Sequence, residues 1–483
     1  ATNLVTGIAT AYMDSVPMVA ITGQVATTMI GTDAFQEADI IGASLPLVKH
    51  SFQVRTPDQV QSTIHKAFYI ASTGRPGPVL VDVPADVQKG MGDYKYSTEL
   101  DFLGYHPENL YDVSQLEAAV SLIEHAERPV IFAGGGVIRS GASELLIDFA
   151  LKYEIPVTTT LLGKGAFPES HPSGLALGMA GMHGHPVANR ALMGADVIIA
   201  IGSRFSDRTT GNRQRFAADA KIIHIDLDAA EIDKAIETDV YLVGDAARVL
   251  EALADAMKKK IADHGEWNRH LSEVREKEPM PRHEYSGEIA PWQVLETLHD
   301  LTKGEAVLTT EVGQNQMWAA QLYNFTEPRT LLTSGGLGTM GYGFPAAIGA
   351  QFAYPNKLVI DVSGDGSFQM NLQELITAVS NKLPVKVLLL NNGCLGMVRQ
   401  LQDLFYGGRL NAVDIPDQPD FVKLAEAYGA EGYRVAKLED LESTLRTAFA
   451  SPNTAIIDVI VERDENVYPT VPSGASLDEM LLL

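Results

Sequence analysis

The chain of 483 residues has 61 acidic and 37 basic side chains, a net charge of −24, 46% hydrophobic residues and one cysteine. This composition indicates an ordinary globular protein of two or three domains, and it excludes a disordered, collagenous or disulfide-stapled chain. The acidic balance argues against a nucleic-acid partner. No apolar run reaches the roughly 20 residues of a membrane helix, so we expect a cytoplasmic or organelle-matrix protein with no membrane partner.

Short apolar segments alternate with helical patterns along the whole chain. This alternation predicts an α/β fold of three doubly wound parallel sheets. In the first block, residues 1–92, strands are expected at 18–23 and 78–83 and a helix at 56–72. The chain runs at once into apolar residues without a starting strand, so we expect this first domain to be truncated at its N-terminus.

Two linkers are expected to separate the blocks. Residues 93–112 are rich in Tyr, Asp, Glu and Pro and lack a period, and the charged residues 257–290 suggest a solvated helix and a second linker. The middle block, residues 113–256, is expected to have strands at 128–132, 155–160, 196–201 and 221–225. The third block, residues 291–463, is expected to have strands at 306–310, 330–334, 357–362, 385–390 and 455–461. The tail, residues 464–483, is either a lid over a site or a disordered end.

The sharpest motif is Gly364-Asp365-Gly366 at the end of one apolar strand, followed after 24 residues by Asn391-Asn392 at the end of another. Ligands of parallel sheets bind beyond the carboxyl ends of the strands, so both segments are expected at one site. A carboxylate, an amide oxygen and backbone carbonyls suit Mg²⁺, which is commonly held together with substrate phosphates. Two tight strand-to-helix turns would explain the same residues equally well.

A second motif, Gly336-x-Gly338-x-x-Gly341, matches the dinucleotide fingerprint, with Asp361 near the place of a ribose-binding acid. This match alone is weak, and Met340 with the surrounding glycines could instead form a wall against a flat cofactor ring. An NAD-dependent dehydrogenase is therefore one alternative, although it leaves the spacing of the first motif unexplained.

The middle block has glycine turns after several strands, together with arginines and an acid. Backbone amides and guanidinium groups suit phosphates, and a carboxylate suits ribose hydroxyls, so these turns favour a large nucleotide over simple chain reversal. No zinc spacing, P-loop or serine elbow is found in the sequence. His183 and His185 flank a glycine, and for His185 a role in the turn is the better interpretation.

Taken in order, these segments resemble the thiamine diphosphate-dependent enzymes, and within them the catalytic subunits of acetohydroxyacid synthase, also called acetolactate synthase. The matching stretches are 1–24, 31–37, 74–83, 181–184, 202–211, 311–321, 334–351 and 364–406. The resemblance implies a pyrimidine-binding domain, a central FAD-binding domain and a diphosphate-binding domain. It also implies a homodimer or tetramer with thiamine diphosphate, Mg²⁺ and FAD, and a small regulatory subunit as a possible partner.

The resemblance also assigns site residues. Asp365, the side chain of Asn392 and the carbonyl of Cys394 would be the Mg²⁺ ligands. Residues expected to contact thiamine diphosphate are Val312, Gly313, Gln314, Asn315, Gly338, Met340, Gly366, Ser367 and Met370, with Met340 holding the cofactor bent. Residues expected to contact FAD are Arg75, Gly134, Gly135, Thr160, Leu161, Met182, His183, Gly202, Ser203, Arg204, Asp226 and Asp245.

The implied reaction is decarboxylation of pyruvate and ligation of the two-carbon unit to a second 2-keto acid, pyruvate or 2-ketobutyrate, early in branched-chain amino acid biosynthesis. Arg208 would bind the carboxylate of the second acid, and Phe35, Gln36, Met182 and Met397 would shape the pocket. A pyruvate oxidase or decarboxylase using FAD and thiamine diphosphate is the enzyme alternative. The second alternative is a fragment that binds the cofactors but is catalytically inactive.

Four departures from the family pattern qualify this expectation. The family's activating glutamate would lie upstream of residue 1, so this chain is expected to be nearly inactive. Leu401 stands where the family usually has tryptophan, which predicts weaker discrimination between acceptor acids and mainly acetolactate as product. Ala26 and Ala85 replace a proline and a lysine of the inhibitor channel, which predicts weak sulfonylurea binding, and Ser206 replaces a flavin-segment aspartate.

Overall fold

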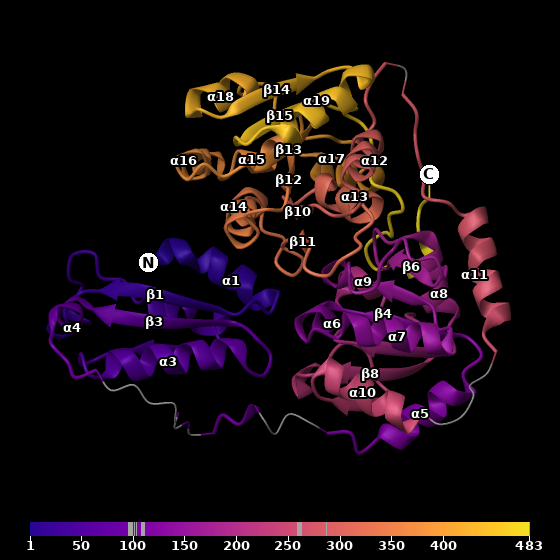
Figure 1. The fold of residues 1–483 in the computed structure, drawn as a ribbon, viewed down its shortest axis with the longest axis horizontal. Helices are drawn as coiled ribbons and strands as arrows, with labels where there is room; N and C mark the ends of the chain where they lie inside the picture. The colour runs from indigo at the N-terminus through magenta and orange to yellow at the C-terminus, as the bar shows by residue number, and fades with distance from the viewer. Residues whose placement is uncertain are drawn as a thin grey trace. The chain divides into compact units, whose positions relative to one another are not determined.

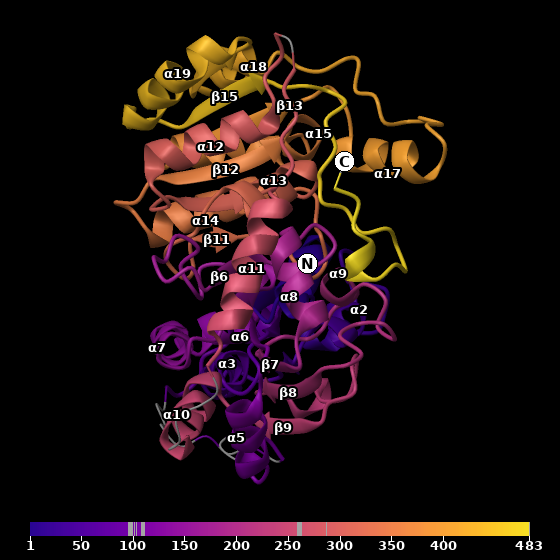
Figure 2. The same cartoon turned by 90° about the vertical axis from the view of Figure 1, so that its right-hand side faces the viewer.

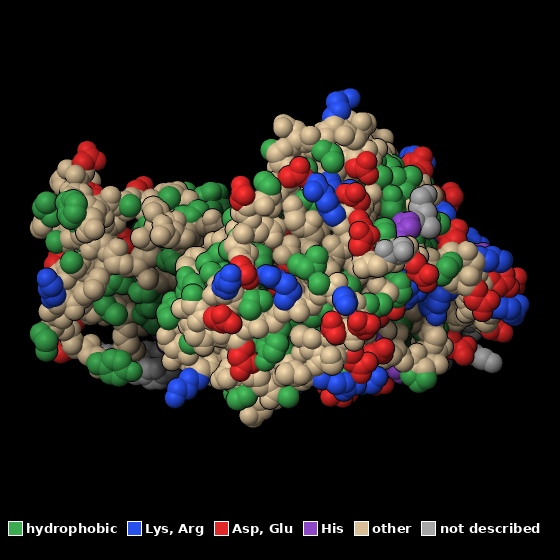
Figure 3. Space-filling view, turned by 90° about the horizontal axis from the view of Figure 1, so that it is seen from above, with side chains coloured by type: hydrophobic (Ala, Val, Ile, Leu, Met, Phe, Trp, Pro, Cys, Tyr) green, Lys and Arg blue, Asp and Glu red, His purple; other side chains and the backbone are tan. Residues whose placement is uncertain are grey.

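The computed structural model describes residues 1–94, 100, 102, 104–107, 112–257, 263–285 and 287–482. The chain divides into an N-terminal unit, residues 1–111 with 334–339, and a main unit, residues 112–333 with 340–483. Most of the predicted linker 93–112 and Lys258, Lys259 and Lys260 of the second lie outside the described residues. On the face drawn in Figure 3, acidic and basic side chains are interspersed.

The N-terminal unit holds a parallel sheet of three strands in the order β1-β3-β2. Val79 and Val81 of β3 pack against Ala67 and Ile70 of helix α3, and Leu80 faces the other side. This alternation follows from the two-residue period of a strand. The elements are α1 Val5–Met13, β1 Met18–Gln24, α2 Ile40–Ser44, β2 His50–Gln53, α3 Gln59–Ser72, β3 Pro78–Pro84 and α4 Ala85–Lys89, with 3₁₀ turns η1 Thr2–Leu4, η2 Thr27–Met29 and η3 Leu45–Leu47.

The first half of the main unit is built on a six-stranded parallel sheet, the central sheet, in the order β6-β5-β4-β7-β8-β9. Its inner strands β4 and β7 are fully buried because helices cover both faces (Figure 2). The strands are β4 Pro129–Ala133, β5 Val157–Thr159, β6 Ala176–Met179, β7 Val197–Ile201, β8 Lys221–Asp226 and β9 Val240–Val243. The helices are α5 Leu116–His125, α6 Gly135–Arg139, α7 Ser143–Tyr153, α8 Pro186–Gly194, α9 Asp207–Thr210, α10 Ala246–Ala256 and α11 Gly265–Lys277, with turns η5 Leu161–Gly163 and η6 Ala229–Glu231.

The second half holds another six-stranded parallel sheet, the C-terminal sheet, in the order β11-β10-β12-β13-β15-β14. Alternate residues of its strands feed two separate cores: α12, α13 and α19 cover one face and α14, α16 and α18 the other (Figure 1). The strands are β10 Val307–Thr310, β11 Leu331–Leu332, β12 Val359–Gly364, β13 Lys386–Asn391, β14 Glu431–Val435 and β15 Ala455–Ile460. The helices are α12 Pro291–Thr302, α13 Gln314–Leu322, α14 Gly343–Ala353, α15 Asp365–Phe368, α16 Leu375–Ser380, α17 Gly396–Phe405, α18 Phe421–Tyr428 and α19 Leu438–Ala450, with turns η7 Leu372–Glu374 and η8 Leu477–Glu479.

Two segments are more closely packed than the sequence suggests. Helix α11, inside the predicted second linker, buries Trp267 and Leu271 in the core that also holds α8 and β4. The C-terminal tail is docked in the main unit, because Val471 N donates to Met182 O at 2.9 Å and Leu477 is fully buried. Within the described part of the chain, no helix is long and apolar enough to span a bilayer.

Candidate functional site

The residues expected to bind the metal lie at one edge of the C-terminal sheet. Strands β10, β12 and β13 are parallel neighbours, so their carboxyl ends meet at this edge. Asp365 follows β12 directly, and Asn392 and Cys394 follow β13. Gly364, the residue before Asp365, pairs with Leu390 across β12 and β13, and the backbone amide of Asn392 contributes to lowering the pKa of the Asp365 carboxylate against the larger effect of burial. The structure therefore brings together the two loops that the sequence connected only by their spacing.

The carboxylate of Asp365 is buried, with 1% of the residue exposed. Burial raises its pKa to about 6, against hydrogen bonds from backbone amides and Gln418 Nε2 that lower it. The sequence reasoning missed Gln418, because a glutamine in an irregular loop belongs to no motif. No three His, Cys, Asp or Glu side chains cluster as a metal site in the described residues, so a cation at Asp365 would draw its other protein ligands from amide and carbonyl oxygens.

Asn392 is held by hydrogen bonds at both ends of its side-chain amide. Its Oδ1 accepts from Cys394 N at 3.2 Å, and its Nδ2 donates to Gln314 Oε1 at 3.4 Å. Gln314 Nε2 donates in turn to Gln400 Oε1 and to the Glu465 carbonyl, each at 2.9 Å. The side chain of Gln314 is thus engaged inside the protein, so only its backbone N–H, at the start of α13, remains for the diphosphate.

The other predicted diphosphate residues shape the same edge. Gly313 precedes α13 with a φ of 148°, and Asn315 Nδ2 ties that helix to Val362 O of β12 at 2.8 Å. The hydroxyl of Ser367 accepts from Gly364 N at 3.2 Å and so closes the turn. A Cβ added to Gly366 would lie 3.9 Å from the Met340 methyl group. Met340 therefore lies beside the glycine turn, and half-buried Val312 completes this set of residues.

The dinucleotide fingerprint is not formed as a strand, tight turn and helix. Strand β11 ends at Leu332 and helix α14 begins only at Gly343. The Gly336 amide donates to the Asp14 carboxylate of the N-terminal unit at 2.7 Å. Asp361 is fully buried and accepts a hydrogen bond from Thr309 Oγ1 at 3.1 Å, so it is closed to a ribose. The structure contradicts the NAD-dehydrogenase interpretation of this motif.

A second buried carboxylate at this edge, Glu311, was missed by the sequence reasoning. It accepts from Gly341 N at 2.6 Å and from Phe344 N at 3.2 Å, and so fixes the turn that follows Met340. Burial raises the pKa of Glu311 to about 7. Burial and the nearby charge of Glu311 raise the pKa of Asp361 well above its usual range. In the sequence, the one feature that could have indicated a role for Glu311 is its position directly after the buried strand β10.

The main-unit residues expected to contact FAD gather at one edge of the central sheet. All six strands are parallel, and each ends in or is followed by at least one of these residues. In strand order from β4 to β9 they are Gly134 and Gly135, Thr160 and Leu161, Met182 and His183, Gly202 with Ser203 and Arg204, Asp226, and Asp245. The hydroxyl oxygens of Thr159 and Ser203 are buried there without a hydrogen-bond partner in the described part of the chain. Unsatisfied polar atoms at this edge fit a polar ligand.

Several of these residues also have structural roles. A Cβ on Gly134 would lie 2.1 Å from Gly202 O, so the two loops need glycine for their own packing. Asp245 caps α10 by accepting from Ala247 N at 3.1 Å. Burial lowers the pKa of His183 to about 4, and its Nδ1 lies 3.2 Å from the Pro469 carbonyl of the tail.

Four predicted contacts belong to the N-terminal unit, namely Phe35, Gln36, Arg75 and Gly338. Phe35 is 88% exposed on a loop that the Glu37 carboxylate closes through the amides of Gly31 and Ala34. Gln36 in this loop has a φ of 62°. Arg75 Nε donates to Ser15 Oγ at 2.9 Å. The structure thus presents Phe35 to solvent on a loop with defined internal hydrogen bonds.

The remaining predicted residues differ in exposure. The side chain of Arg208 is 69% exposed, and its Nη1 lies 3.2 Å from the sulfur of Met182. Met397 packs against the core of the C-terminal sheet. Met370 and Leu401 are 52% and 43% exposed, so these two do not line a closed pocket in the main unit by themselves.

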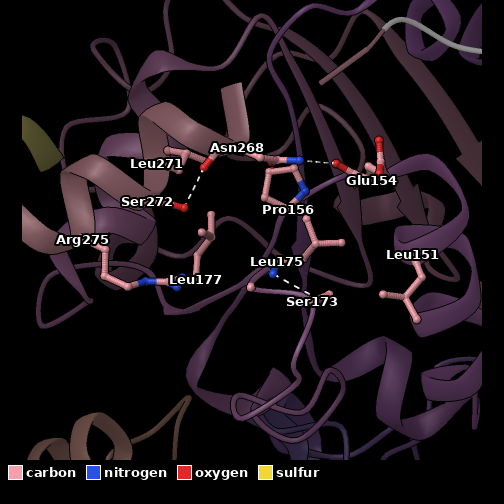
Figure 4. A pocket seen from close by; sticks show the side chains of 11 residues that line it. Leu151, Glu154, Pro156, Ser173, Leu175, Leu177, Asn268, Leu271, Ser272 and Arg275 are labelled. Carbon is pink, nitrogen blue, oxygen red and sulfur yellow. Dashed lines mark hydrogen bonds between the residues drawn. The ribbon is translucent and has the colours of Figure 1, made fainter. Parts of the chain in front are cut away.

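A cavity of about 390 Å³ lies at the opposite edge of the central sheet, where β5 and β6 begin (Figure 4). Asn268 Nδ2 donates to the Glu154 carbonyl at 2.9 Å, and the Arg275 guanidinium donates to the Ala176 carbonyl. These polar groups join α11 to the sheet. None of the predicted site residues lines this cavity.

Comparison with family models matches three parts of the chain to thiamine pyrophosphate enzymes. The N-terminal TPP binding domain matches residues 1–43, the central domain residues 116–253 and the C-terminal TPP binding domain residues 311–459. The last match contains the predicted metal and diphosphate residues.

The relatives are named acetolactate synthases. The chain is 47% identical to the probable acetolactate synthase large subunit of Methanocaldococcus jannaschii, over all of this chain and 83% of the relative. It is 45% identical to the acetolactate synthase large subunit of Haemophilus influenzae, over all of this chain and 85% of that protein. It is 48% identical to the large subunit of Corynebacterium glutamicum, over 99% and 77% of the two chains. At this identity and coverage, the chain belongs to the acetolactate synthase large-subunit family of thiamine pyrophosphate enzymes.

Proposed function

We propose that this protein is an acetolactate synthase that decarboxylates pyruvate and ligates the two-carbon unit to a second 2-keto acid, pyruvate or 2-ketobutyrate. The observation that carries the proposal is that the Asp365 and Asn392 loops follow the paired strands β12 and β13 at one edge of the C-terminal sheet. Residues 311–459, which include both loops, match the C-terminal TPP binding domain of thiamine pyrophosphate enzymes, and the relatives that match the whole chain are named acetolactate synthases.

The donor set at this edge fits Mg²⁺. Asp365 is buried and its charge is not offset by an ion pair among the described residues, so a divalent cation would stabilise the ionised form. Asn392 Oδ1 and the Cys394 carbonyl supply the hard oxygen ligands that Mg²⁺ prefers. We propose these three residues as its protein ligands.

The turns around the metal ligands fit a diphosphate. The N-terminus of α13 offers the free backbone amides of Gln314 and Asn315 next to Gly313, and helix N-termini favour anions. Gly366 and Ser367 supply a second turn where the backbone can approach closely. We propose that these residues bind the diphosphate and that Met340 supports the bent cofactor.

When bound, thiamine diphosphate supplies the carbon nucleophile and the electron sink for decarboxylation. The residues of the chain have positioning tasks. Arg208, with an exposed guanidinium, is proposed to bind the carboxylate of the second keto acid. Phe35, Gln36, Met182, Met397 and Leu401 are proposed to shape the pocket, and Gly338 and Met370 to contact the cofactor.

The edge of the central sheet fits FAD in a structural role, because six strand ends converge and buried hydroxyls there lack partners among the described residues. The residues named above for this edge, with Arg75 of the N-terminal unit, make up the proposed contact set. We also propose a homodimer or tetramer, a small regulatory subunit as partner because the relatives are called large subunits, and a cytoplasmic location.

The test is the cofactor content of the purified protein after incubation with thiamine diphosphate, Mg²⁺, FAD and NAD, followed by desalting and mass analysis. Retention of thiamine diphosphate with FAD is expected. Retention of NAD without thiamine diphosphate would overturn the proposal. Whatever amount of pyruvate the protein converts is expected to appear as acetolactate, whereas acetaldehyde or acetate alone would identify a decarboxylase or an oxidase.

Leu401 carries a prediction about the acceptor acid. Its side chain lies on the exposed face of α17, so a larger group can replace it without overpacking a core. Leu401→Trp is expected to shift the product toward acetohydroxybutyrate when pyruvate and 2-ketobutyrate compete, because an indole adds apolar contact for the extra methyl group. The measurement is the product ratio by mass spectrometry, and an unchanged ratio would refute the role of this position.

A further inference from the structure

Two buried side-chain amides, Gln400 and Gln314, connect the C-terminal tail to the proposed metal ligand Asn392. Gln400 and Gln314 are 0% and 3% exposed, and Asn392 is half-buried at the site. A side-chain amide can turn either its oxygen or its nitrogen toward a neighbour. A metal such as Mg²⁺ accepts only the oxygen, so the direction in which Asn392 is turned decides whether it can act as a ligand.

The direction of these amides is set by backbone groups of the tail, which cannot change roles. The backbone N–H of Val467 is a donor, so the atom of Gln400 that it meets at 2.7 Å is the oxygen. The other atom, Gln400 Nε2, donates to Val467 O at 3.2 Å and to Thr470 Oγ1 at 3.1 Å. All the polar atoms of Gln400 are therefore engaged, with Oε1 facing Gln314.

The orientation of Gln400 in turn fixes the orientation of the Gln314 amide, and Gln314 fixes that of Asn392. Gln314 Nε2 meets two acceptors, Gln400 Oε1 and the Glu465 carbonyl. Its Oε1 consequently faces Asn392 and accepts from Nδ2 at 3.4 Å. With its nitrogen engaged there, Asn392 presents its oxygen on the other side, where Cys394 N donates to it and a lone pair is left for a cation.

Two further features keep this arrangement in place. A Cβ on Gly396 would lie 2.0 Å from Gln314 Oε1 and 2.8 Å from Asn392 Nδ2, so residue 396 must lack a side chain for the two amides to meet. Arg399 is 2% exposed and donates to the carbonyls of Asp464 and Glu465 at 3.0 and 2.9 Å. The Arg399 guanidinium thereby holds in place the tail segment whose backbone groups orient Gln400 and Gln314.

We propose that Gln400 is a positioning residue that, through Gln314, turns the oxygen of Asn392 toward the catalytic metal and so makes metal affinity depend on docking of the C-terminal tail. The inference deepens the proposed function and rests on it. Gln400 does not touch the metal in this account. It acts through hydrogen bonds whose direction is fixed by the backbone of residues 465–467.

The test is a calorimetric Mg²⁺ titration of the full chain with thiamine diphosphate present. Gln400→Leu removes the acceptor for Gln314 and is expected to weaken Mg²⁺ binding about tenfold, as loss of a group that orients a metal ligand does. Gln400→Glu keeps the acceptor oxygen for Gln314 but loses the donor to Val467 O and Thr470 Oγ1, so it is expected to restore part of the affinity. Gln402→Leu is the matched control, because the side chain of Gln402 on the same helix forms hydrogen bonds only with the backbone of Asn411 among the described residues.

The same substitution made in an Asn392→Asp variant distinguishes a loss of amide orientation from a general disturbance of the structure. In Asn392→Asp both side-chain atoms are oxygens, so orientation no longer matters. Adding Gln400→Leu to Asn392→Asp is expected to change the Mg²⁺ affinity less than about twofold. The proposal would be overturned if Gln400→Leu lowered the Mg²⁺ affinity equally in the Asn392 protein and in the Asn392→Asp variant, or if it did not lower the affinity of the Asn392 protein. Absence of Mg²⁺-dependent cofactor binding in the unmodified chain would overturn the proposed function itself, and this inference with it.

Discussion

At the scale of single residues, the candidate site depends on polar groups that are buried with defined partners. The spacing of the motif predicts that Asp365 and Asn392 lie at one site, and the structure places them directly after the paired strands β12 and β13. Gln400, Gln418 and Glu311 were not predicted. A glutamine gives no periodic or motif signal, and its role depends on which backbone groups the folded chain brings to it.

The buried pair Glu311 and Asp361 predicts a pH dependence of stability. Burial raises both pKa values, that of Glu311 to about 7. In the unfolded chain both carboxyl groups lose their protons at about pH 4, whereas in the folded protein they keep them to higher pH. The folded state therefore binds more protons than the unfolded state in this range, so stability falls as pH rises from about 4 through the folded pKa values. Asp361→Asn removes one charge and can still bind Thr309 and Ser363.

Asp361→Asn is therefore expected to raise the apparent melting temperature by about 2 to 4 °C at pH 8, with the gain shrinking toward pH 5. Thermal unfolding of both proteins across this pH range is the measurement. A variant that is less stable at pH 8, or a difference that does not vary with pH, would contradict the assignment of a repulsive pair.

At the scale of elements, the strands that the sequence reasoning missed share one property. They are β2, β6, β9 and β14, and each lies at the edge of its sheet. Inner strands such as β12 and β13 are buried on both faces and give continuous apolar runs that are easy to recognise. Two of the missed strands, β2 His50–Gln53 and β14 Glu431–Val435, are mixed in polarity and resemble loops. The other two, β6 and β9, are apolar but only 4 residues long, which is too short to show a period.

Helix α11 shows why charge alone misleads about packing. Its mostly charged sequence predicted a solvated helix within a linker, but Trp267 is 6% exposed and its Nε1 donates to Pro129 O at 3.2 Å. Trp267→Ala is expected to cost about 3 to 5 kcal/mol by creating a cavity and leaving that carbonyl unpaired. Urea unfolding measures the loss of stability, and hydrogen exchange of the β4 amides shows whether the loss is felt at this strand. Arg269→Ala on the exposed face is the control, and an equal effect of both changes would contradict the packing role.

At the scale of the whole molecule, the C-terminal tail connects the two edges at which cofactors are proposed to bind. It contacts Gln314 and Gln400 at the C-terminal sheet, and Met182 and His183 beyond the central sheet. The sequence did not decide whether this tail is a lid or a disordered end, because its docking depends on hydrogen bonds to residues far away in the chain, from 67 positions for Gln400 to 286 for His183.

Undocking the tail is expected to weaken flavin binding. Leu477 is fully buried in the core of the central sheet, and Leu477→Ala removes much of the apolar area that holds the tail. The flavin absorbance retained after desalting is expected to fall, because Val471 and Pro469 then lose their contacts with Met182 and His183. Leu481→Ala, at a residue 38% exposed, is the matched control. Full flavin retention in Leu477→Ala would contradict the coupling.

The central claim is that the C-terminal sheet holds thiamine diphosphate through a cation at Asp365, and equilibrium dialysis of thiamine diphosphate tests it most directly. The unmodified protein is expected to bind the cofactor with Mg²⁺ and to lose it with EDTA. Asp365→Ala is expected to bind it at least about 100-fold more weakly while retaining FAD at the central sheet. Equal thiamine diphosphate affinity in the two proteins, or binding unaffected by EDTA, would contradict the account.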